Sequence, residues 1–592
     1  MPKLSDTKSE ASKENKLGHE AIALKAGGEP LPPGPGEPAP QLDPEEFIGK
    51  TSATEGSPNT GDQFRFWLRR GVLINPFDFV AVEHEGGSTT IGVVREMRLI
   101  TDAMSHLSNF VSSNFGDIAE APNTLRVGTT VVTAGVMSNS GVPLADRPDQ
   151  VEVGLPLGSD KPVRFATADE VERALGISSM KNPIPAGIIE MSNGTQVPVM
   201  VNGDYLLGPE GAHINASGTS GLATKTSFLM FLLQAVYSRI PDKVAIVLFN
   251  VKQHDLLHVD QSPRDLSARD HRIYSALGIR PTELPKNSVK YFLPHGHDGP
   301  NSEFKPDSYD QYAYEFADAK DKLNLLFSEI DDPQSTIESI VEHIRDQTDL
   351  ISKKDVADAA GTIILNSGQK VQTWIQLRHY DSFPEDVVTH RYSLFRFRRH
   401  LSRMTKGNPL FPKARGECVN LGDRIKEIKA GDVYVIDMAR ITKPEEQAFI
   451  VGDVMASIDE LYVSGEEEPP KNIIVLIDEL NRYCPAKQTP SSVAEQIIEI
   501  ARTGRSRGVV LFGAQQFKSA VNNQVNDNCA THVIGRTGTQ ELSSTAYRFL
   551  DDLTKTSVSH LGKGELVLAH PLFRQPVRIV FPRPAYRRQE VS

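Results

Sequence analysis

Residues 214–236 read INASGTSGLATKTSFLMFLLQAV, and this stretch decides the fold class. A short apolar strand leads into a turn rich in Gly and Thr, which passes through Lys225, Thr226 and Ser227 into a helix. In such turns, backbone N–H groups and a helix N-terminus converge on phosphate oxygens, a lysine reaches the β- and γ-phosphates, and a hydroxyl holds Mg²⁺. The pattern therefore predicts a phosphate-binding loop.

The loop departs from the usual spacing G-x-x-x-x-G-K-[ST], which would place glycines at positions 219 and 224. Threonines occupy both positions, and the glycines are Gly218 and Gly221. A plain Gly/Thr turn before a buried helix is the alternative interpretation. As the phosphate-binding loop we assign Gly218, Thr219, Ser220, Gly221, Leu222, Ala223, Thr224, Lys225, Thr226 and Ser227.

A second motif, NIIVLIDELNRYCP at residues 472–485, has five apolar residues that run directly into Asp478 and Glu479. A buried strand ending in two acids places both at the carboxyl edge of a sheet, where ligands of open α/β folds bind. One acid can hold Mg²⁺ and the other can polarise the attacking water. The pattern alone leaves open which of the two acids has which role. A capped strand end is the alternative for this motif alone, but the two motifs together predict ATP and Mg²⁺ as cofactors.

A third motif lies in IARTGRSRGVVLFGAQQ, residues 500–516. Arg505 and Arg507 precede a buried strand that ends in Gln515 and Gln516. A polar residue at the tip of the strand beside the acids can sense the γ-phosphate. An arginine ahead of that strand can project to a neighbouring subunit and stabilise charge on the transferring phosphoryl group. Solvated surface arginines are the alternative interpretation.

The chain divides into segments that differ in composition and in hydrophobic pattern. Residues 1–60 are rich in Pro, Gly and charged residues, which predicts a disordered tail. Short β-rich runs between turn signals predict a small N-terminal β-barrel over residues 61–185, with one helix at 102–112. From residue 186 to 592, continuous apolar strands alternate with helices, so we expect an α/β domain with a buried parallel sheet. Amphipathic helices over about 305–405 predict a helical insertion.

Composition limits the other possibilities. The 592 residues carry a net charge of -12 and only 3 cysteines, so neither a disulfide framework nor a cysteine zinc site is expected. With no signal peptide and no long apolar run in view, we expect a cytoplasmic protein that does not engage a membrane. The acidic charge disfavours a surface that coats nucleic acid, but a ring can confine basic groups to its channel. Residues 391–415 are locally basic and interleaved with aromatics, which is compatible with nucleic-acid contact or with a solvated helix face.

The motif order resembles the HerA branch of the HerA/FtsK family of P-loop translocases, and most closely its bacterial antiphage-defence members. The resemblance runs over about residues 62–584, nearly all of the expected folded part. The segments that carry it are GTSGLATKTS, VLFNVKQHDLLH, VYVIDMAR, IIVLIDELNRY, GRSRGVVLFGAQQ, HVIGRTG and GKGELVLAHPL.

This resemblance implies a RecA-like ATPase core behind a barrel like the HAS barrel of the family. It also implies a DNA translocase of the helicase type that forms a homo-oligomeric, hexameric ring on double-stranded DNA. An effector, a nuclease or a sirtuin-like NADase, would dock on the barrel. By this resemblance, Lys225 falls at the nucleotide lysine, Thr226 and Asp478 fall at the metal-holding hydroxyl and acid, and Glu479 falls at the catalytic base. Gln515 falls at the family's polar sensor and Arg505 at the intersubunit arginine, with Arg507 and Arg536 as further candidates.

Two other functions remain open at this stage. The irregular loop is compatible with a scaffold that assembles and activates an effector when ATP binds, without translocation. A conjugation or secretion pump of the same superfamily is the second alternative.

Overall fold

The structure is a computed structural model of the whole chain. It describes residues 46–140, 154–219, 224–253, 255–264, 266–328, 330, 336–352, 363–364, 370–371, 373–379, 391–464, 469–486 and 491–587. None of the helices within these ranges is both long enough and apolar enough to cross a membrane.

The predicted barrel is confirmed. Six strands close in the order β1-β2-β5-β4-β3-β6, and Phe64 and Phe66, two residues apart on β2, are both fully buried. The barrel starts before the expected boundary at residue 61, because β1 pairs with both β2 and β6 and closes the cylinder. Its strands are β1 (Gly49–Thr51), β2 (Gln63–Leu68), β3 (Phe79–Glu83), β4 (Thr89–Thr101), β5 (Gly128–Ser140) and β6 (Pro162–Phe165).

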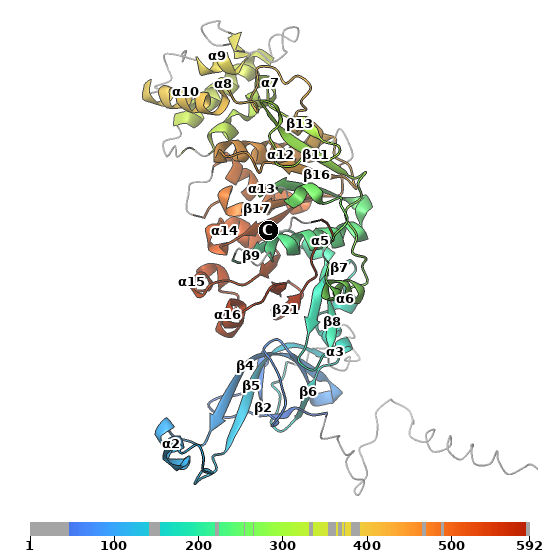
Figure 1. Cartoon of the computed structure of the whole chain (residues 1–592), viewed down its shortest axis with the longest axis vertical. Helices are drawn as coiled ribbons and strands as arrows, with labels where there is room; N and C mark the ends of the chain where they lie inside the picture. Colours follow the sequence, from blue (N-terminus) through green and yellow to red (C-terminus); the bar gives the residue numbers. More distant parts are fainter. Residues whose placement is uncertain are drawn as a thin grey trace, which may run out of the picture. The chain divides into compact units, whose positions relative to one another are not determined.

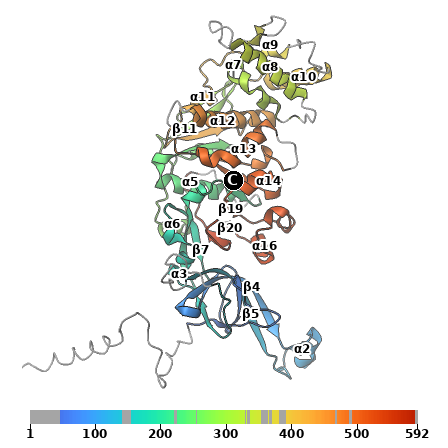
Figure 2. The same ribbon diagram turned by 180° about the vertical axis from the view of Figure 1, so that it is seen from behind.

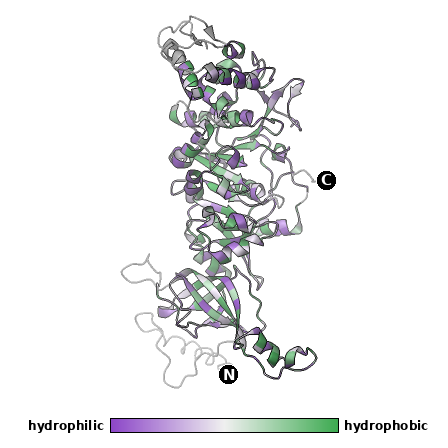
Figure 3. Ribbon diagram, turned by 90° about the vertical axis from the view of Figure 1, so that its left-hand side faces the viewer, coloured by the Kyte–Doolittle hydropathy of each residue, from purple (hydrophilic) through white to green (hydrophobic). Residues whose placement is uncertain are grey.

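Strands β4 and β5 are long and extend into an arm that carries α2 (His106–Ser112) (Figure 1). The expected helix at 102–112 is present but begins later, because Ser105 caps it in a reciprocal capping box with Ser108. The arm, residues 97–127, exposes many large apolar side chains, and Figure 3 shows green segments along it. They are Met97, Leu99, Ile100, Met104, Leu107, Phe110, Val111, Phe115, Ile118, Leu125 and Val127.

The α/β part is built on a sheet of 13 strands within the described residues. Its centre, β11-β16-β10-β17-β18-β9-β19, is parallel, and β20, β21, β7 and β8 extend it with antiparallel pairings. Strand β18 separates the strand of the phosphate loop, β9, from the strand of the acids, β17, as in a RecA-like core. The expected fold class is confirmed. The central strands are β9 (Ile214–Ser217), β10 (Val244–Asn250), β11 (Val289–Gly296), β16 (Val433–Asp437), β17 (Asn472–Asp478), β18 (Val509–Gln515) and β19 (Thr531–Ile534). The flanking strands are β7 (Pro183–Glu190), β8 (Gln196–Asn202), β12 (Gly299–Pro300), β13 (Asp310–Tyr312), β20 (Glu565–Ala569) and β21 (Val577–Val580).

Helices cover both faces of this sheet, which is why its strands are continuously apolar. On β17, Ile474 and Leu476 enter the core under α5 (Lys225–Arg239). The alternate residues Ile473 and Val475 enter the core under α12 (Pro444–Ser464) and α13 (Ser492–Arg507). Figures 1 and 2 show α5 and α13 on the two sides of the strands. Further helices along the chain are α3 (Ala168–Ala174), α4 (Gly203–Leu206), α6 (Ala268–Ala276), α11 (Leu421–Lys426), α14 (Asn523–Asn528), α15 (Thr539–Leu542) and α16 (Asp552–Ser559).

Two expected boundaries need correction. Strand β7 starts at Pro183 and belongs to the large sheet, so the barrel and the α/β part meet between residues 165 and 183 rather than at 185. Strand β13 lies inside the expected insertion at 305–405 but pairs in parallel with β11, so the helical segment begins after residue 312. Its helices are α7 (Phe316–Ala319), α8 (Thr336–Ser352), α9 (Trp374–Arg378) and α10 (Arg391–Thr405), with a 3-10 stretch at Lys320–Phe327.

Candidate nucleotide site

The sheet brings the two main motifs to one edge. In the parallel register, Asp478 at the end of β17 pairs with Ala514 on β18, and Gln515 on β18 pairs with Ser217 at the end of β9. Neighbouring strands lie about 4.8 Å apart, so the ends of β9 and β17 are about 10 Å apart, the scale of a nucleotide's phosphates. The predicted proximity of the lysine turn and the acids is therefore present.

The predicted phosphate turn starts at a residue whose backbone conformation requires glycine. Gly218 has φ 148, a conformation that L side chains rarely adopt, and an added Cβ would lie 3.1 Å from the Cα of Gly535. The next residue is anchored, because Thr219 donates from its backbone N–H to the Arg536 carbonyl at 2.8 Å. The assigned residues Ser220, Gly221, Leu222 and Ala223 lie outside the described residues.

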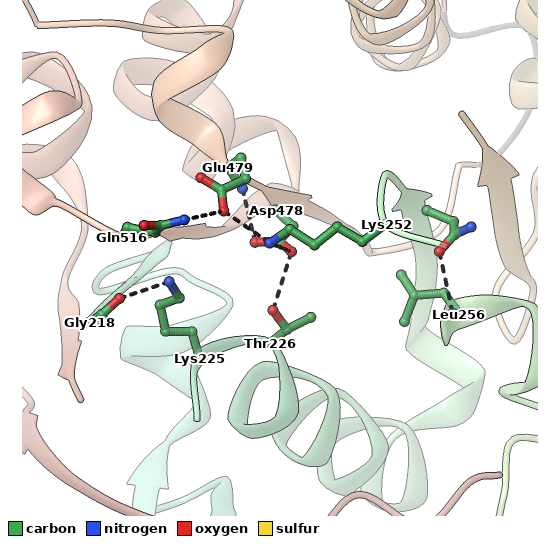
Figure 4. A network of polar contacts seen from close by, with 9 residues as sticks. Gly218, Lys225, Thr226, Lys252, Leu256, Asp478, Glu479 and Gln516 are labelled. Carbon is green, nitrogen blue, oxygen red and sulfur yellow. Dashed lines mark hydrogen bonds and ion pairs between the residues drawn. The ribbon is translucent and has the colours of Figure 1, made fainter. Parts of the chain in front are cut away.

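Helix α5 begins directly at the residues predicted to bind phosphate. Lys225 is its first residue, and its Nζ donates to the Gly218 carbonyl at 2.8 Å, so the ammonium points back over the turn (Figure 4). Burial lowers the pKa of Lys225, against the opposing pull of Glu479 and Asp478. Thr226 Oγ1 donates to Asp478 Oδ2 at 3.4 Å, which joins the two motifs directly. Thr224 and Ser227 are both buried beside them.

The two acids have different partners. Asp478 Oδ1 accepts the backbone N–H of Glu479 at 3.0 Å, while Oδ2 faces Thr226. Glu479 has a left-handed backbone, φ 58, which is uncommon for this residue type and is found more often at functional sites. Its Oε1 accepts from Gln516 Nε2 at 3.4 Å. Both carboxylates are buried, so their charges act in a medium of low dielectric constant.

One member of the site, Lys252, was not predicted from the sequence. Its Nζ lies 2.8 Å from Asp478 Oδ2 and 2.9 Å from Glu479 Oε1, so one ammonium bridges both acids. Burial lowers the pKa of Lys252, but the two carboxylates outweigh it and raise the pKa overall. The same contacts hold the pKa of Glu479 below its ordinary value, although burial alone would raise it. Lys252 lies two residues after the end of β10, and β10 neighbours β17. This position after a strand of the parallel sheet was the only feature of the sequence that could have indicated its role.

The side-chain oxygens of Thr226 and Asp478 suit a magnesium ion. Mg²⁺ prefers oxygen ligands, and Thr226 Oγ1 and Asp478 Oδ2 offer a hydroxyl and a carboxylate at one point. An ammonium already sits against the same carboxylate oxygen, which shows that this point attracts a cation. Thr226 and Asp478 would hold the ion beside the phosphates.

No protein-family model matches the chain, and no curated protein matches it. Among solved structures, it is similar to the bacterial conjugative coupling protein TrwBΔN70, with 14% identity and a TM-score of 0.43 over 72% of this chain and 95% of that chain. It is also similar to VirB4 of Thermoanaerobacter pseudethanolicus, with 13% identity and a TM-score of 0.40 over 68% and 96%. TrwB in complex with ADP and Mg²⁺ gives 13% identity and a TM-score of 0.40 over 64% and 86%.

The two glutamines at the end of β18 point to different partners. Gln515 is fully buried and donates from Nε2 to Asn215 Oδ1 at 2.6 Å, within the sheet. Gln516 reaches Glu479. The assignment of Gln515 as the sensor stays a prediction, but the geometry favours Gln516, because alternate residues of a strand point to opposite sides.

The arginines ahead of β18 lie at the opposite edge of the sheet from the acids. Strand β18 runs from Val509 to Gln515, so Arg505 and Arg507 lie about 20 Å from the carboxyl edge of their own subunit. Arg507 forms an ion pair with Asp459. Arg505 is exposed and donates to a neutral group, the Glu210 carbonyl, at 3.1 Å. Arg536, also exposed, follows β19 at the same edge as the acids.

Helix α10 presents a mixed aromatic and basic face. Tyr392 and Phe395 are 72% and 59% exposed, and Arg399 and Arg403 are exposed four residues apart on the same helix. Lys406, directly after the helix, is also exposed. The opposite face packs into the core of the helical segment through Phe397, Leu401 and Met404. One of the cations, Arg403, is paired with Glu445.

Proposed function

We propose that this chain is an ATP-hydrolysing motor whose identical subunits form a ring on double-stranded DNA. One observation carries the ATPase part of this proposal: Lys225 and Thr226 at the start of α5 meet Asp478 and Glu479 at the same edge of the sheet. A lysine over a glycine turn, a hydroxyl beside a carboxylate and a second buried carboxylate are the groups that phosphoryl transfer to water requires.

Each group has a distinct role in this proposal. Lys225 binds the β- and γ-phosphates, and residues 218–227 surround them. Thr226 and Asp478 hold Mg²⁺, which neutralises charge on the phosphates when it is bound. Glu479 orients the attacking water and accepts its proton. Gln516, which contacts the base, is placed to report on the γ-phosphate.

The site is completed in this proposal by an arginine from the next subunit. Arg505 cannot reach the nucleotide of its own subunit, because it lies at the far edge of the sheet. Its guanidinium is exposed and bonded to a carbonyl rather than a carboxylate, whereas Arg507 is paired with Asp459. An arginine supplied by a neighbour stabilises the charge that develops on the transferred phosphoryl group. A hexameric ring gives every subunit such a neighbour.

The ATPase claim is tested by measuring Mg·ATP binding and phosphate release. Lys225→Met should abolish binding while the chain stays folded, because the substitution removes a buried charge and retains most of the side-chain volume. Lys290→Met, which removes one half of a surface ion pair with Asp432, is the matched control and should behave as the wild type. Undiminished ATP binding in Lys225→Met would contradict the proposal.

We propose the exposed face of α10 as a DNA contact. Phosphate contacts are strongly salt-dependent, and aromatic side chains add stacking. Arg399→Ala should weaken duplex binding and reduce the slope of log K against log salt by about 1. Lys243→Ala removes an exposed cation elsewhere and should leave the slope unchanged. Equal slopes in Arg399→Ala and the wild type would exclude this surface.

DNA also separates the motor from a scaffold. A translocating ring should hydrolyse ATP faster when duplex DNA is present. A scaffold that assembles an effector on ATP binding should show no DNA stimulation, and its effector should stay active with Glu479→Gln. Absence of DNA stimulation together with an active effector in Glu479→Gln would favour the scaffold function over the motor function.

We further propose that the ring works with a separate effector, a nuclease or a sirtuin-like NADase, in bacterial antiphage defence. The resemblance of the GTSGLATKTS loop supports the defence role, and the exposed apolar side chains of the arm support docking on the barrel. The test is co-purification with the product of the neighbouring open reading frame. Ile118→Asp on the arm should abolish it, whereas Leu73→Asp, an exposed residue on the barrel outside the arm, should not.

A further inference from the structure

The acids of the nucleotide site already have a cationic partner. Lys252 Nζ contacts Asp478 Oδ2 at 2.8 Å and Glu479 Oε1 at 2.9 Å. The other nearby cation, Lys225, is bonded to the Gly218 carbonyl instead. Among the described residues, Lys252 is therefore the group that directly neutralises the two acids.

Neutralisation is needed because the carboxylates are buried side by side. Their side chains are only 6% and 7% exposed, and adjacent buried charges of the same sign are costly without a counter-ion. Lys252 also bridges Asp478, the proposed metal ligand, to Glu479, the proposed base, and Gln516 contacts the same Glu479 oxygen. The ammonium thus fixes the direction of the base.

The position of Lys252 conflicts with an occupied metal site. Thr226 Oγ1 and Lys252 Nζ both contact Asp478 Oδ2. A magnesium ion held by Thr226 and Asp478 would compete with the Lys252 ammonium for this oxygen. The lysine can yield, because its side chain is 50% exposed and its flexible stem can move the ammonium into solvent.

We propose that Lys252 is a positioning residue that acts as the internal counter-ion of Asp478 and Glu479 and is displaced by the cation of Mg·ATP. Before nucleotide binds, it keeps free divalent cations from Asp478 and Glu479. Its displacement couples arrival of the metal nucleotide to release of the Glu479 carboxylate. The proposal deepens the proposed ATPase function and rests on Thr226 and Asp478 being the metal site.

The test measures Mn²⁺ binding to nucleotide-free protein by electron paramagnetic resonance of the free ion. Lys252→Met should bind Mn²⁺ at least about tenfold more tightly than the wild type, or about 1.4 kcal/mol. Lys252→Arg keeps the charge and should stay within about threefold of the wild type. Lys290→Met removes a lysine of similar exposure, 47%, that is paired with Asp432, and should change nothing.

Equal or weaker Mn²⁺ binding by Lys252→Met would overturn the proposal, as would equally tightened binding by Lys252→Arg or Lys290→Met. Lys252→Gln serves as a second neutral variant, and thermal unfolding verifies that each protein is folded. A separate arm adds a non-hydrolysable ATP analogue to the wild type, which should then take up Mn²⁺. Failure of that arm would contradict the nucleotide site itself, whereas failure of the first arm alone would contradict only the role of Lys252.

Discussion

Replacing Glu479 by glutamine tests the proposed base with the least disturbance of the site. The substitution keeps the volume of the side chain and removes one charge. Lys252 keeps its 2.8 Å contact with Asp478, so its charge stays paired, and the amide oxygen of a glutamine can still accept hydrogen bonds from Lys252 and Gln516. We therefore expect Glu479→Gln to unfold at nearly the wild-type temperature.

The effect on catalysis should be much larger. An amide cannot accept the proton of the attacking water, and a general base contributes about 10²- to 10⁴-fold in rate. That factor corresponds to about 3–5 kcal/mol in the activation free energy. ATP binding should be retained or strengthened, because a negative charge near the γ-phosphate is removed. The variant should thus lose kcat while its nucleotide affinity persists.

Phosphate release measures kcat, and titration with a fluorescent ATP analogue measures the dissociation constant. Glu499→Gln on α13 is the matched control, because Glu499 is exposed and its ion pair with Arg502 is long, at 3.8 Å. It should change neither quantity. A Glu479→Gln protein that keeps its kcat within about tenfold of the wild type would refute the role of the base, given the size expected for that role.

Three further predictions follow from the geometry. Gly218→Ala should destabilise the fold by about 1–3 kcal/mol in urea unfolding, because φ 148 and the Gly535 backbone leave no room for a Cβ. Gly538→Ala places its Cβ in open space and should leave the stability unchanged, so equal stabilities of the two variants would contradict this prediction. Gln516→Ala should lower kcat. Gln515→Ala breaks a buried hydrogen bond and should mainly lower the free energy of unfolding, by about 1–3 kcal/mol. The reverse pattern would favour Gln515 as the sensor. Burial lowers the pKa of His570 from 6.5 to about 4, so its contribution to stability is complete above about pH 6.5 and is lost as pH falls towards 4, about 2 kcal/mol of it by pH 5. His570→Gln should show a correspondingly smaller loss of unfolding free energy between pH 7 and pH 5 than the wild type, and an unchanged loss would refute the assignment.

The physical basis of the His570 prediction is visible in its contacts. Its Nε2 accepts the backbone N–H of Asn202 at 3.1 Å, and a ring nitrogen that accepts a hydrogen bond cannot carry a proton. The folded state therefore requires neutral His570, while the unfolded chain takes up the proton freely. Stability must fall with acidification in this pH range.

The sequence predicted those parts of the fold that depend on a few neighbouring residues. Strand β17 reads as five apolar residues followed by two acids, because both faces of the strand are buried and its carboxyl edge is polar. The glycine turn before α5 is equally local. These two motifs were sufficient to predict the parallel sheet and the meeting of Lys225, Thr226, Asp478 and Glu479.

Features that depend on distant pairing were not predictable. Strand β1 has only three residues and β13 likewise three, too short for a periodic signal, and their partners alone define them. Lys252 lies 226 residues from Asp478 in the chain, and only the adjacency of β10 and β17 joins them. The side chains of Gln515 and Gln516 diverge for a reason that needs the direction of β18 relative to its neighbours.

A structure determined with Mg²⁺ and a non-hydrolysable ATP analogue tests the central claim most directly. We expect phosphates between the start of α5 and the end of β17, with the metal beside Thr226 and Asp478 and the ammonium of Lys252 moved off the Asp478 carboxylate. A nucleotide bound elsewhere, with Lys252 still bridging Asp478 and Glu479, would contradict it.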